Sequence, residues 1–491
     1  MNYIGVDLGT SALKLLLVDE HGGKIKELSR EYPIYFPHSG WSEQNPKDWL
    51  DAVISGLKEM LEDQDPATIG AISFAGQMHG LVILDDKDQV IRPAILWNDG
   101  RCEDECQRLN EGLGLDALID NTGNIAFAGF TAPKLLWLRE HERENYDRIS
   151  KVMLPKDYLV YTLSGVHATD VSDASGMLLF DVKNRKWSET MLEIVGLKEE
   201  QMAKVYESYQ SVGYVKKTIS DMTGLSTSTK VVVGAGDNAA AAVGTGVVRE
   251  GDMNLSLGTS GTLFIASDNY LRDSSGAMHS FCHANGKNHL MGCILSAASC
   301  NKWWMDKILE ISDYGAEQAR IADEHLADNK VFFLPYLMGE RTPHNDTDAR
   351  AAFLGMSMDT TREEMTLAVL EGVAFALRDC LELAKKDGAS PTSSMISGGG
   401  VKSELWLKIV ANVLHMKLTV PEISEGPSLG AAILAAVGNK EYRSVEEAAK
   451  KIVGVSRTIE PDPELEAKYD EKYKVYKAIY PALKDLYKSM K

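Results

Sequence analysis

The sequence predicts an α/β protein built from two similarly folded domains that face each other. One observation is length, because 491 residues are too many for a single hydrophobic core. The other is a repeat: the tetrad Leu-Gly-Thr-Ser stands at 8–11 and again at 257–260, each time between apolar strands. One repeat at half the chain length indicates two like domains and not a solenoid. We expect domains at 1–245 and 246–491, and whether a last helix at about 465–490 packs back on the first domain stays open.

Composition excludes several classes of protein. The formal net charge is −19, which argues against nucleic acid as a partner because a phosphate-backbone binder needs a basic face. The chain enters a strand at once without a signal peptide, and no apolar run is long enough for a membrane span, so we expect a cytoplasmic protein. The six cysteines are scattered and are expected to be reduced thiols. The oligomeric state stays open, with a homodimer as one option.

The first tetrad is predicted to form a tight hairpin. Apolar residues alternate on both sides of Gly9 and Thr10, which predicts two strands with these residues in the turn. Such a turn directs backbone N–H groups and the hydroxyls of Thr10 and Ser11 into one space, which suits phosphate oxygens, and Asp7 beside it suits magnesium. The alternative is an ordinary solvent-facing hairpin. The second copy has Ser256 where the first has Asp7, so the halves share a scaffold and divide the chemistry.

Two further strands of the first half end in polar residues. A buried strand at 69–75 runs into Gly76-Gln77-Met78-His79-Gly80, and ligands approach α/β sheets at such strand ends. His79 taken alone is also typical of a core histidine. Another strand runs into Trp97-Asn98-Asp99-Gly100-Arg101, whose amide, carboxylate and guanidinium suit the hydroxyls of a polyol. The alternative there is a turn in which Asp99 and Arg101 pair with each other.

The end of the first half carries a candidate base. β-branched residues at 231–233 predict a strand that continues through Gly234-Ala235-Gly236 to Asp237, followed by an alanine-rich helix. A helix N-terminus favours an ionised carboxylate, which can accept a proton from a bound hydroxyl. The alternative is a plain N-cap. Other predicted helices begin after Asn45, with Pro46 at the first position, and after a turn at 129–133, where the pattern indicates an amphipathic helix.

The second half offers a run of three glycines. A strand at 394–397 ends in Gly398-Gly399-Gly400 before a helix, and such glycines allow a ligand to approach closely and leave N–H groups to bind it. Asn301 and Ser403 stay unassigned. Because the candidate base precedes residue 245 whereas Thr259 and the glycine run follow it, we expect the two bodies to close together about the glycines at 244–251.

Together these residues resemble the FGGY family of carbohydrate kinases over essentially the full length. The segment from Gly129 to His141 looks like the family's first signature, and Ala351 to Glu371 looks like the second. Met78-His79-Gly80, Trp97 to Arg101 and Gly236 to Ala239 resemble the forms found in members that act on D-xylulose. Glycerol kinases carry an Arg-Glu pair where Met78 and His79 stand, which disfavours glycerol.

The resemblance implies two ribonuclease H-like domains of the actin and hexokinase type, with ATP and a sugar meeting in the cleft between them. It implies ATP-dependent phosphorylation of D-xylulose at the 5-hydroxyl, as part of xylose metabolism, with Mg²⁺ as the metal. By this similarity Asp237 is the catalytic base and Asp7 supports Mg-ATP. The residues expected to bind the sugar are Met78, His79, Trp97, Asp99 and Asn238. Those expected to bind ATP are Thr10, Ser11, Thr259, Gly399 and Gly400.

Two alternative functions remain at the level of the sequence. One is a kinase for another ketose or polyol, such as ribulose. The other is a non-kinase actin-like ATPase, which would not need Asp237 beside polyol-binding residues.

Overall fold

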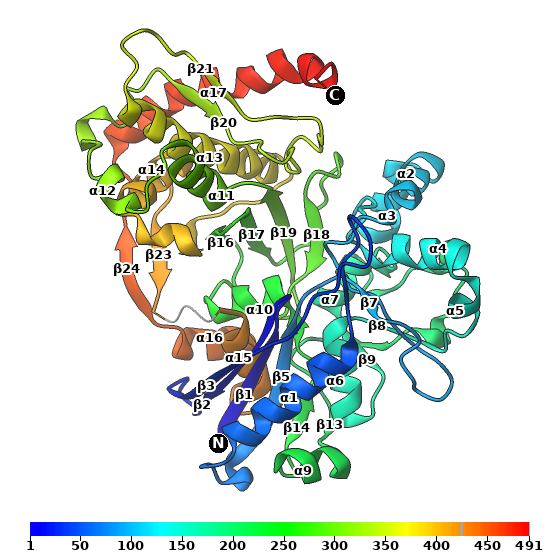
Figure 1. The fold of residues 1–491 in the computed structure, drawn as a ribbon. Helices are drawn as coiled ribbons and strands as arrows, with labels where there is room; N and C mark the ends of the chain where they lie inside the picture. The colour runs from blue at the N-terminus through cyan, green and yellow to red at the C-terminus, as the bar shows by residue number, and fades with distance from the viewer. Residues whose placement is uncertain (423–425, 491) are drawn as a thin grey trace.

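Two seven-stranded sheets form the centre of the protein (Figure 1). The computed structural model describes residues 1–422 and 426–490. The first sheet runs in the order β13 (Ser211–Tyr214), β14 (Lys230–Val232), β5 (Ile69–Gly76), β1 (Asn2–Leu8), β2 (Ala12–Val18) and β3 (Lys24–Glu31), and β15 (Ala235–Gly236) also pairs with β5. The second runs in the order β18 (His279–Cys282), β19 (Asn288–Ile294), β17 (Gly261–Ser267), β16 (Asp252–Leu257), β22 (Ser393–Ser397), β23 (Leu418–Pro421) and β24 (Val455–Ile459).

The two sheets repeat one topology. β1 pairs antiparallel with β2 and parallel with β5, and β5 pairs parallel with β14. β16 pairs in the same way with β17 and β22, and β22 pairs parallel with β23. The strand order around the repeated hairpin is therefore the same in both halves, and the two-domain α/β fold predicted from the tetrads is confirmed. The boundary between residues 245 and 246 stays a prediction.

Helices cover both faces of the first sheet. One face packs against α1 (Pro46–Met60), α6 (Pro155–Ser164) and α9 (Lys217–Thr223), and the other against α10 (Asp237–Gly244) and α15 (Gly426–Gly438). α1 begins as predicted, because the Asn45 side chain accepts a hydrogen bond from the N–H of Lys47 and Pro46 is the first helical residue. Its buried face presents Trp49, Val53 and Leu57 to the sheet.

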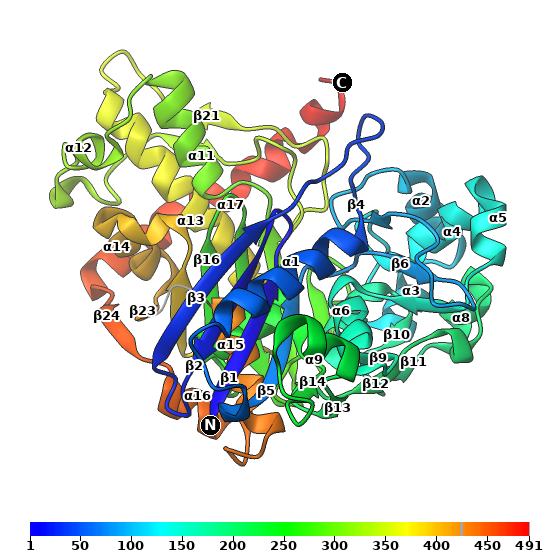
Figure 2. The same cartoon turned by 60° about the horizontal axis from the view of Figure 1, so that its bottom comes forward.

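The remaining elements of the first half lie to one side of this sheet (Figure 2). The helices there are α2 (Glu103–Gly112), α3 (Leu115–Thr122), α4 (Thr131–His141), α5 (Arg143–Asp147), α7 (Val171–Ala174) and α8 (Glu189–Val195). Short strands pair as β4 (Glu43–Gln44) with β7 (Ala94–Ile95), β6 (Val82–Leu84) with β8 (Lys151–Met153), β9 (Ala168–Asp170) with β12 (Lys204–Tyr206), and β10 (Phe180–Asp181) with β11 (Lys186–Trp187).

The helix α4 differs from the amphipathic helix that the sequence predicts. Every residue from Thr131 to Leu138 is buried, so the first two turns have no solvent face. Lys134 lies in this interior stretch with 0% of its surface exposed. The prediction was wrong because the buried stretch includes a lysine, a residue type that usually lies on the surface and gives a helix pattern a polar face.

Most helices of the second half pack around the long helix α13 (Arg362–Lys386), which begins at a capping box formed by Thr361 and Glu364. The last helix, α17 (Pro463–Lys488), packs its buried tyrosines against α13 and α14 (Glu404–Leu414). Tyr476, for example, donates a hydrogen bond to the carbonyl of Gly372. α17 therefore packs on the second half, which corrects the option that it packs back on the first. The other elements are α11 (Ala298–Trp303), α12 (Tyr314–Gln318), α16 (Val445–Ile452), β20 (Phe332–Leu334) and β21 (Ala352–Leu354).

α15 belongs to the second half in sequence but packs on the first sheet. It crosses α10 and contacts β1 and β5. A Cβ added at Gly430 would lie 1.8 Å from the carbonyl oxygen of Ala240, and one added at Gly244 would lie 1.9 Å from that of Gly426. Only glycine allows two helix backbones to approach this closely. Gly244 is thus fixed in a helix contact. Closure of the two bodies about the glycines at 244–251 stays a prediction.

Membrane insertion and disulfide bonding can both be checked in the structure. Among residues 1–422 and 426–490, none of the helices combines the length and the apolar character that a membrane crossing requires. All six cysteines are free thiols, as predicted, and five of them are buried. They are core residues.

Candidate active site

Three strands of the first sheet end at the same level and bring the predicted catalytic residues together. In the register of the sheet, Leu8 of β1 lies opposite Gly76 of β5, and Gly76 lies opposite Gly236 of β15. All three strands run parallel, so their carboxyl ends meet at one edge. Asp7 and Asp237 are each within one residue of this level, although 230 positions separate them in the chain.

Asp237 is the first residue of α10. Its Oδ1 accepts hydrogen bonds from the N–H of Asn238 at 2.7 Å and from the side-chain amide of the same residue at 2.9 Å. Its Oδ2 accepts none from any residue that the structure describes. Burial raises the pKa of Asp237 to about 6, against the opposing effect of the two bonds from Asn238. The carboxylate is therefore ionised at neutral pH with one oxygen available as a proton acceptor.

A buried network of hydrogen bonds and ion pairs supports the backbone next to Asp237, and no local pattern in the sequence indicates it. The N–H of Gly236 donates to Oγ of Ser172 at 3.1 Å, and this hydroxyl donates in turn to Oδ2 of Asp170 at 2.5 Å. Lys156 pairs with Asp170 at 2.9 Å and with two more carboxylates, those of Asp157 and Asp173. The four charged side chains are at most 1% exposed. The network fixes the backbone turn from which Asp237 projects.

The first hydroxyl turn is held by the neighbouring segments. Gly9 donates its N–H to the carbonyl of Ala12 at 3.1 Å, which closes the predicted hairpin. Gln44 donates to the Thr10 carbonyl at 2.6 Å, and its own amide oxygen accepts from Gln77 at 2.8 Å. Gln44 thus connects the turn to the residue that precedes Met78. Ser11, next in the turn, is exposed.

Asp7 lies beside this turn, half-buried and opposite Lys14 in the register of β1 and β2. Burial and the charge of Asp7 raise the pKa of Tyr32, whose hydroxyl donates to the carbonyl of Gly9. Asp7 therefore places a negative charge next to the turn. A single carboxylate beside hydroxyl oxygens fits Mg²⁺, which prefers oxygen ligands and keeps several of its waters.

His79 stands at the end of β5 in a left-handed backbone conformation, with φ of 68°. Its Nδ1 lies 2.7 Å from the carbonyl oxygen of Gly176, so Nδ1 carries the hydrogen and Nε2 is left as an acceptor. Burial, together with the charge of Lys134, lowers the pKa of His79 to about 3, so the ring stays neutral. Met78 is buried against Gly236, where an added Cβ would lie 3.0 Å from its side chain. Met78 and His79 therefore lie on one side of Asp237.

In the segment at 97–101, Trp97 is exposed beside the first hydroxyl turn, whereas Asp99 is buried in an ion pair. Trp97 is 47% exposed, and its Nε1 donates to Oγ1 of Thr10 at 3.0 Å. Asp99 is buried and binds Arg101 through both carboxylate oxygens, at 2.8 and 2.7 Å. Its Oδ2 also accepts the N–H of Ser42 at 2.6 Å. The structure thus favours the alternative that the sequence left open, an ion pair between Asp99 and Arg101, over a carboxylate available to a sugar.

The second hydroxyl turn borders a pocket of about 840 Å³. Gly258, Thr259, Gly399 and Gly400 all line it, so the structure brings these predicted residues together. The carbonyls of Gly258 and Thr259 accept the N–H groups of Ala298 and Ala297, which anchors the turn to the start of α11. A Cβ added at Gly399 would meet nothing within 4 Å, so this glycine faces open space.

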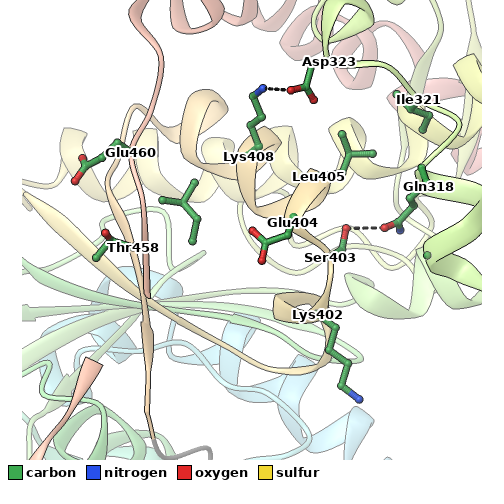
Figure 3. A pocket seen from close by; sticks show the side chains of 13 residues that line it. Gln318, Ile321, Asp323, Lys402, Ser403, Glu404, Leu405, Lys408, Thr458 and Glu460 are labelled. Carbon is green, nitrogen blue, oxygen red and sulfur yellow. Dashed lines mark hydrogen bonds and ion pairs between the residues drawn. The ribbon is translucent and has the colours of Figure 1, made fainter. Parts of the chain in front are cut away.

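The two unassigned polar residues lie in the same region. Ser403 donates to Oε1 of Gln318 at 2.6 Å and accepts the N–H of Trp406, so it is the N-cap of α14 (Figure 3). Asn301 lines the pocket of about 840 Å³. Its Oδ1 is buried and accepts no hydrogen bond from the described part of the chain. No local pattern in the sequence distinguishes these roles, because both depend on residues far away in the chain.

Two family models match the chain. The N-terminal domain of the FGGY family of carbohydrate kinases matches residues 2–244, and the C-terminal domain of the same family matches residues 253–438. The chain belongs to the FGGY family of carbohydrate kinases. Membership makes it an enzyme that phosphorylates a carbohydrate, with ATP as the phosphoryl donor, and it removes the alternative of a non-kinase ATPase.

Relatives within the FGGY family point to more than one sugar. A xylulose kinase from Escherichia coli (strain K12) is 39% identical over 483 residues, which are 98% of this chain and 99% of that protein. A crystal structure of a "xyloylose kinase" from Brucella ovis is 40% identical, with a TM-score of 0.94, and covers 99% of this chain and 100% of its own. A gluconate kinase from Lactobacillus acidophilus has the same TM-score of 0.94 at 26% identity, covering 100% of this chain and 99% of its own. Similarity of fold alone therefore does not distinguish the substrates.

Proposed function

We propose that this protein transfers the γ-phosphoryl group of ATP to the 5-hydroxyl of D-xylulose. The observation that carries the reaction is the strand register that brings Asp7 and Asp237 to one edge of the first sheet. The choice of D-xylulose is supported by the relatives named xylulose kinases, which are 39% and 40% identical over almost the whole chain. The gluconate kinase is less similar, at 26%.

Asp237 acts as the general base. Because Asn238 occupies Oδ1, Oδ2 is the oxygen available to the 5-hydroxyl of the sugar. As the hydroxyl oxygen forms its bond to the γ-phosphorus, its proton passes to Oδ2, and the electrons of the bond that breaks leave with ADP. A base with a pKa of about 6 is ionised at pH 7 and still basic enough to take this proton.

The sugar is held by residues of the first half. Nε2 of His79, which carries no hydrogen, accepts a hydrogen bond from a sugar hydroxyl, and Met78 covers an apolar part of the ring or chain. Asn238 offers its amide oxygen, and Trp97 offers an exposed aromatic face. Asp99 is left out of this set, because protein donors already occupy both of its oxygens.

ATP is held between the two hydroxyl turns. Thr10 and Ser11 on one side and Thr259 on the other bind phosphate oxygens, while Gly399 and Gly400 lie beside the adenosine. Asp7 would hold Mg²⁺, whose positive charge would offset the negative charge of the phosphates. Oδ1 of Asn301, buried and unpaired among the described residues, can accept a hydrogen bond from the amino group of adenine. The sugar site thus belongs to domain 1–245 and the adenosine site to domain 246–491.

One observation favours a second candidate, an acidic sugar such as gluconate. The guanidinium of Arg341 lies 4.1 Å from the ring centre of Phe127 and forms no ion pair with any described residue. The charge of Arg341 also contributes to the low pKa of His79, so Arg341 lies near this proposed sugar-binding residue. An unpaired guanidinium suits a carboxylate.

The test is to identify the product. Protein incubated with ATP, Mg²⁺ and D-xylulose should release ADP and form a sugar monophosphate whose phosphorus couples to C5 in the NMR spectrum. A mixture without sugar is the control for background hydrolysis. Release of ADP without any phosphorylated sugar, or phosphate on another carbon, would refute the proposal.

A further inference from the structure

Lys134 is unusual among the buried lysines of this protein. Among residues 1–422 and 426–490, Lys156 and Lys472 are the other two lysines with little exposed surface, and each pairs with buried carboxylates. Lys134 is 0% exposed and has no carboxylate within ion-pair distance among the residues that the structure describes. Burial lowers its pKa to about 7, which reflects the cost of keeping a charge there. Because burying an unpaired lysine costs free energy, the groups that Lys134 binds should explain why it is there.

Lys134 binds two backbone carbonyls. Its Nζ donates to the carbonyl of His79 at 2.8 Å and to that of Gly129 at 2.6 Å. The hydroxyl of Thr131, one turn earlier on α4, donates to the same His79 carbonyl at 3.1 Å. Two side chains of α4 therefore bind the carbonyl of one residue at the end of β5.

Lys134 and Thr131 bind the carbonyl of His79, whose backbone conformation is unfavourable. His79 has a φ of 68°, and a non-glycine residue pays a steric penalty in this left-handed region. With its carbonyl bound from α4 and its Nδ1 bound to Gly176 at 2.7 Å, both the backbone and the ring are fixed. Fixing both determines the direction in which Nε2 points.

Lys134 also ties a second segment to the same place. Gly129 packs so closely on the Trp97 carbonyl that an added Cβ would lie 2.6 Å from that oxygen. By binding Gly129 and His79 together, Lys134 connects the strand end at 76–80 to the segment at 97–101 and to the start of α4. Two of these segments carry proposed sugar-binding residues, His79 and Trp97.

We propose that Lys134, assisted by Thr131, is a positioning residue that holds His79 in its left-handed conformation so that Nε2 faces the sugar. This inference rests on the proposed function, because it takes His79 as a sugar-binding residue. Lys134 itself touches neither substrate in this account. It acts through the carbonyl of His79.

The first test compares variants in steady-state kinetics. Lys134→Met keeps the length of the side chain and removes its donors, and we expect KM for D-xylulose to rise about tenfold or more, as for loss of a charged hydrogen bond, with KM for ATP unchanged. Thr131→Val removes one donor and should raise the same KM by a smaller factor, while Thr131→Ser, which keeps the hydroxyl, should restore it. Lys472→Met is the matched control: it should lower the melting temperature and leave KM for D-xylulose unchanged.

A double-mutant cycle separates positioning from general stability. If Lys134 acts through His79, then Lys134→Met should change KM for D-xylulose much less in a His79→Ala background than in the wild type. Equal effects in both backgrounds, or a wild-type KM for D-xylulose in Thr131→Val and Lys134→Met alike, would overturn the inference. Neither result would touch the proposed function, which fails only if the wild-type protein does not phosphorylate D-xylulose.

Discussion

Replacing Asp237 with asparagine tests whether this residue is the general base, with little other change to the site. The substitution keeps the size of the side chain and its place at the start of α10. Asparagine cannot take a proton, and a general base contributes about 10² to 10⁴ in rate, so kcat for D-xylulose should fall about a hundredfold or more. Binding of ATP should persist, because the proposed adenosine site lies in the other domain.

The pH dependence follows from the surroundings of the same residue. Burial raises the pKa of Asp237 to about 6, so about nine-tenths of the protein carries the ionised base at pH 7 and about one-tenth at pH 5. Below pH 6, kcat/KM for D-xylulose should therefore fall about tenfold for each pH unit. The folded pKa lies above the unfolded value of about 3.9, so the ionised group destabilises the fold increasingly between about pH 4 and pH 6. At pH 7, Asp237→Asn should melt at the same temperature as the wild type or higher.

These effects can be measured by steady-state assays of ADP release at pH 5 to 8 and by calorimetric melting of the wild type and Asp237→Asn. We expect a large loss of kcat together with unchanged or raised stability. A kcat within a few-fold of the wild type, or a profile that stays flat from pH 7 to pH 5, would refute the assignment of Asp237. Loss of kcat together with a lower melting temperature would point to a structural role instead.

Three other substitutions probe the rest of the site and the fold. Asp7→Asn should raise the magnesium concentration that gives half the maximal rate; a loss of sugar affinity with unchanged magnesium dependence would contradict this. Gln44→Leu should raise KM for ATP about tenfold, since its amide holds the carbonyl of Thr10 at 2.6 Å, and an effect confined to KM for the sugar would show that this link does not support the turn. Gly430→Ala should lower the melting temperature by several degrees, because the new Cβ would lie 1.8 Å from a carbonyl oxygen of α10 and overpacking costs about 1–3 kcal/mol or more. Gly112→Ala, where nothing lies within 4 Å, is its control, and equal melting temperatures would argue against a tight contact between α10 and α15.

The sequence could predict those parts of the fold that depend on residues close together in the chain. The repeated tetrads each form a hairpin, Asn45 caps α1, and Asp237 opens α10, because these features depend on residues only a few positions apart. The sequence also places Asp7, His79 and Asp237 near the ends of predicted strands, but it does not predict that Leu8, Gly76 and Gly236 align at one edge of the sheet. That alignment comes from the structure.

The parts that could not be predicted depend on partners far away in the chain. A carboxylate, an amide and a guanidinium near residue 99 suit either a polyol or one another, and only the buried geometry of Asp99 and Arg101 decides. Lys134 reads as a surface lysine until the structure shows the His79 carbonyl, 55 positions earlier, beside its amine. α15 follows the second sheet in sequence yet packs on the first, which no local pattern indicates.

The choice of substrate can be tested by comparing kcat/KM for ATP-dependent phosphorylation of D-xylulose, D-ribulose, D-gluconate and glycerol under one set of conditions. A site built to hydrogen-bond particular hydroxyls should discriminate strongly, because an analogue that lacks one leaves a buried polar group unpaired. We expect the highest kcat/KM for D-xylulose, about tenfold or more above D-ribulose and D-gluconate, with glycerol far below. A higher value for D-gluconate would assign the unpaired Arg341 to the substrate and contradict the choice of sugar, and glycerol used as efficiently as D-xylulose would contradict the whole proposed sugar site.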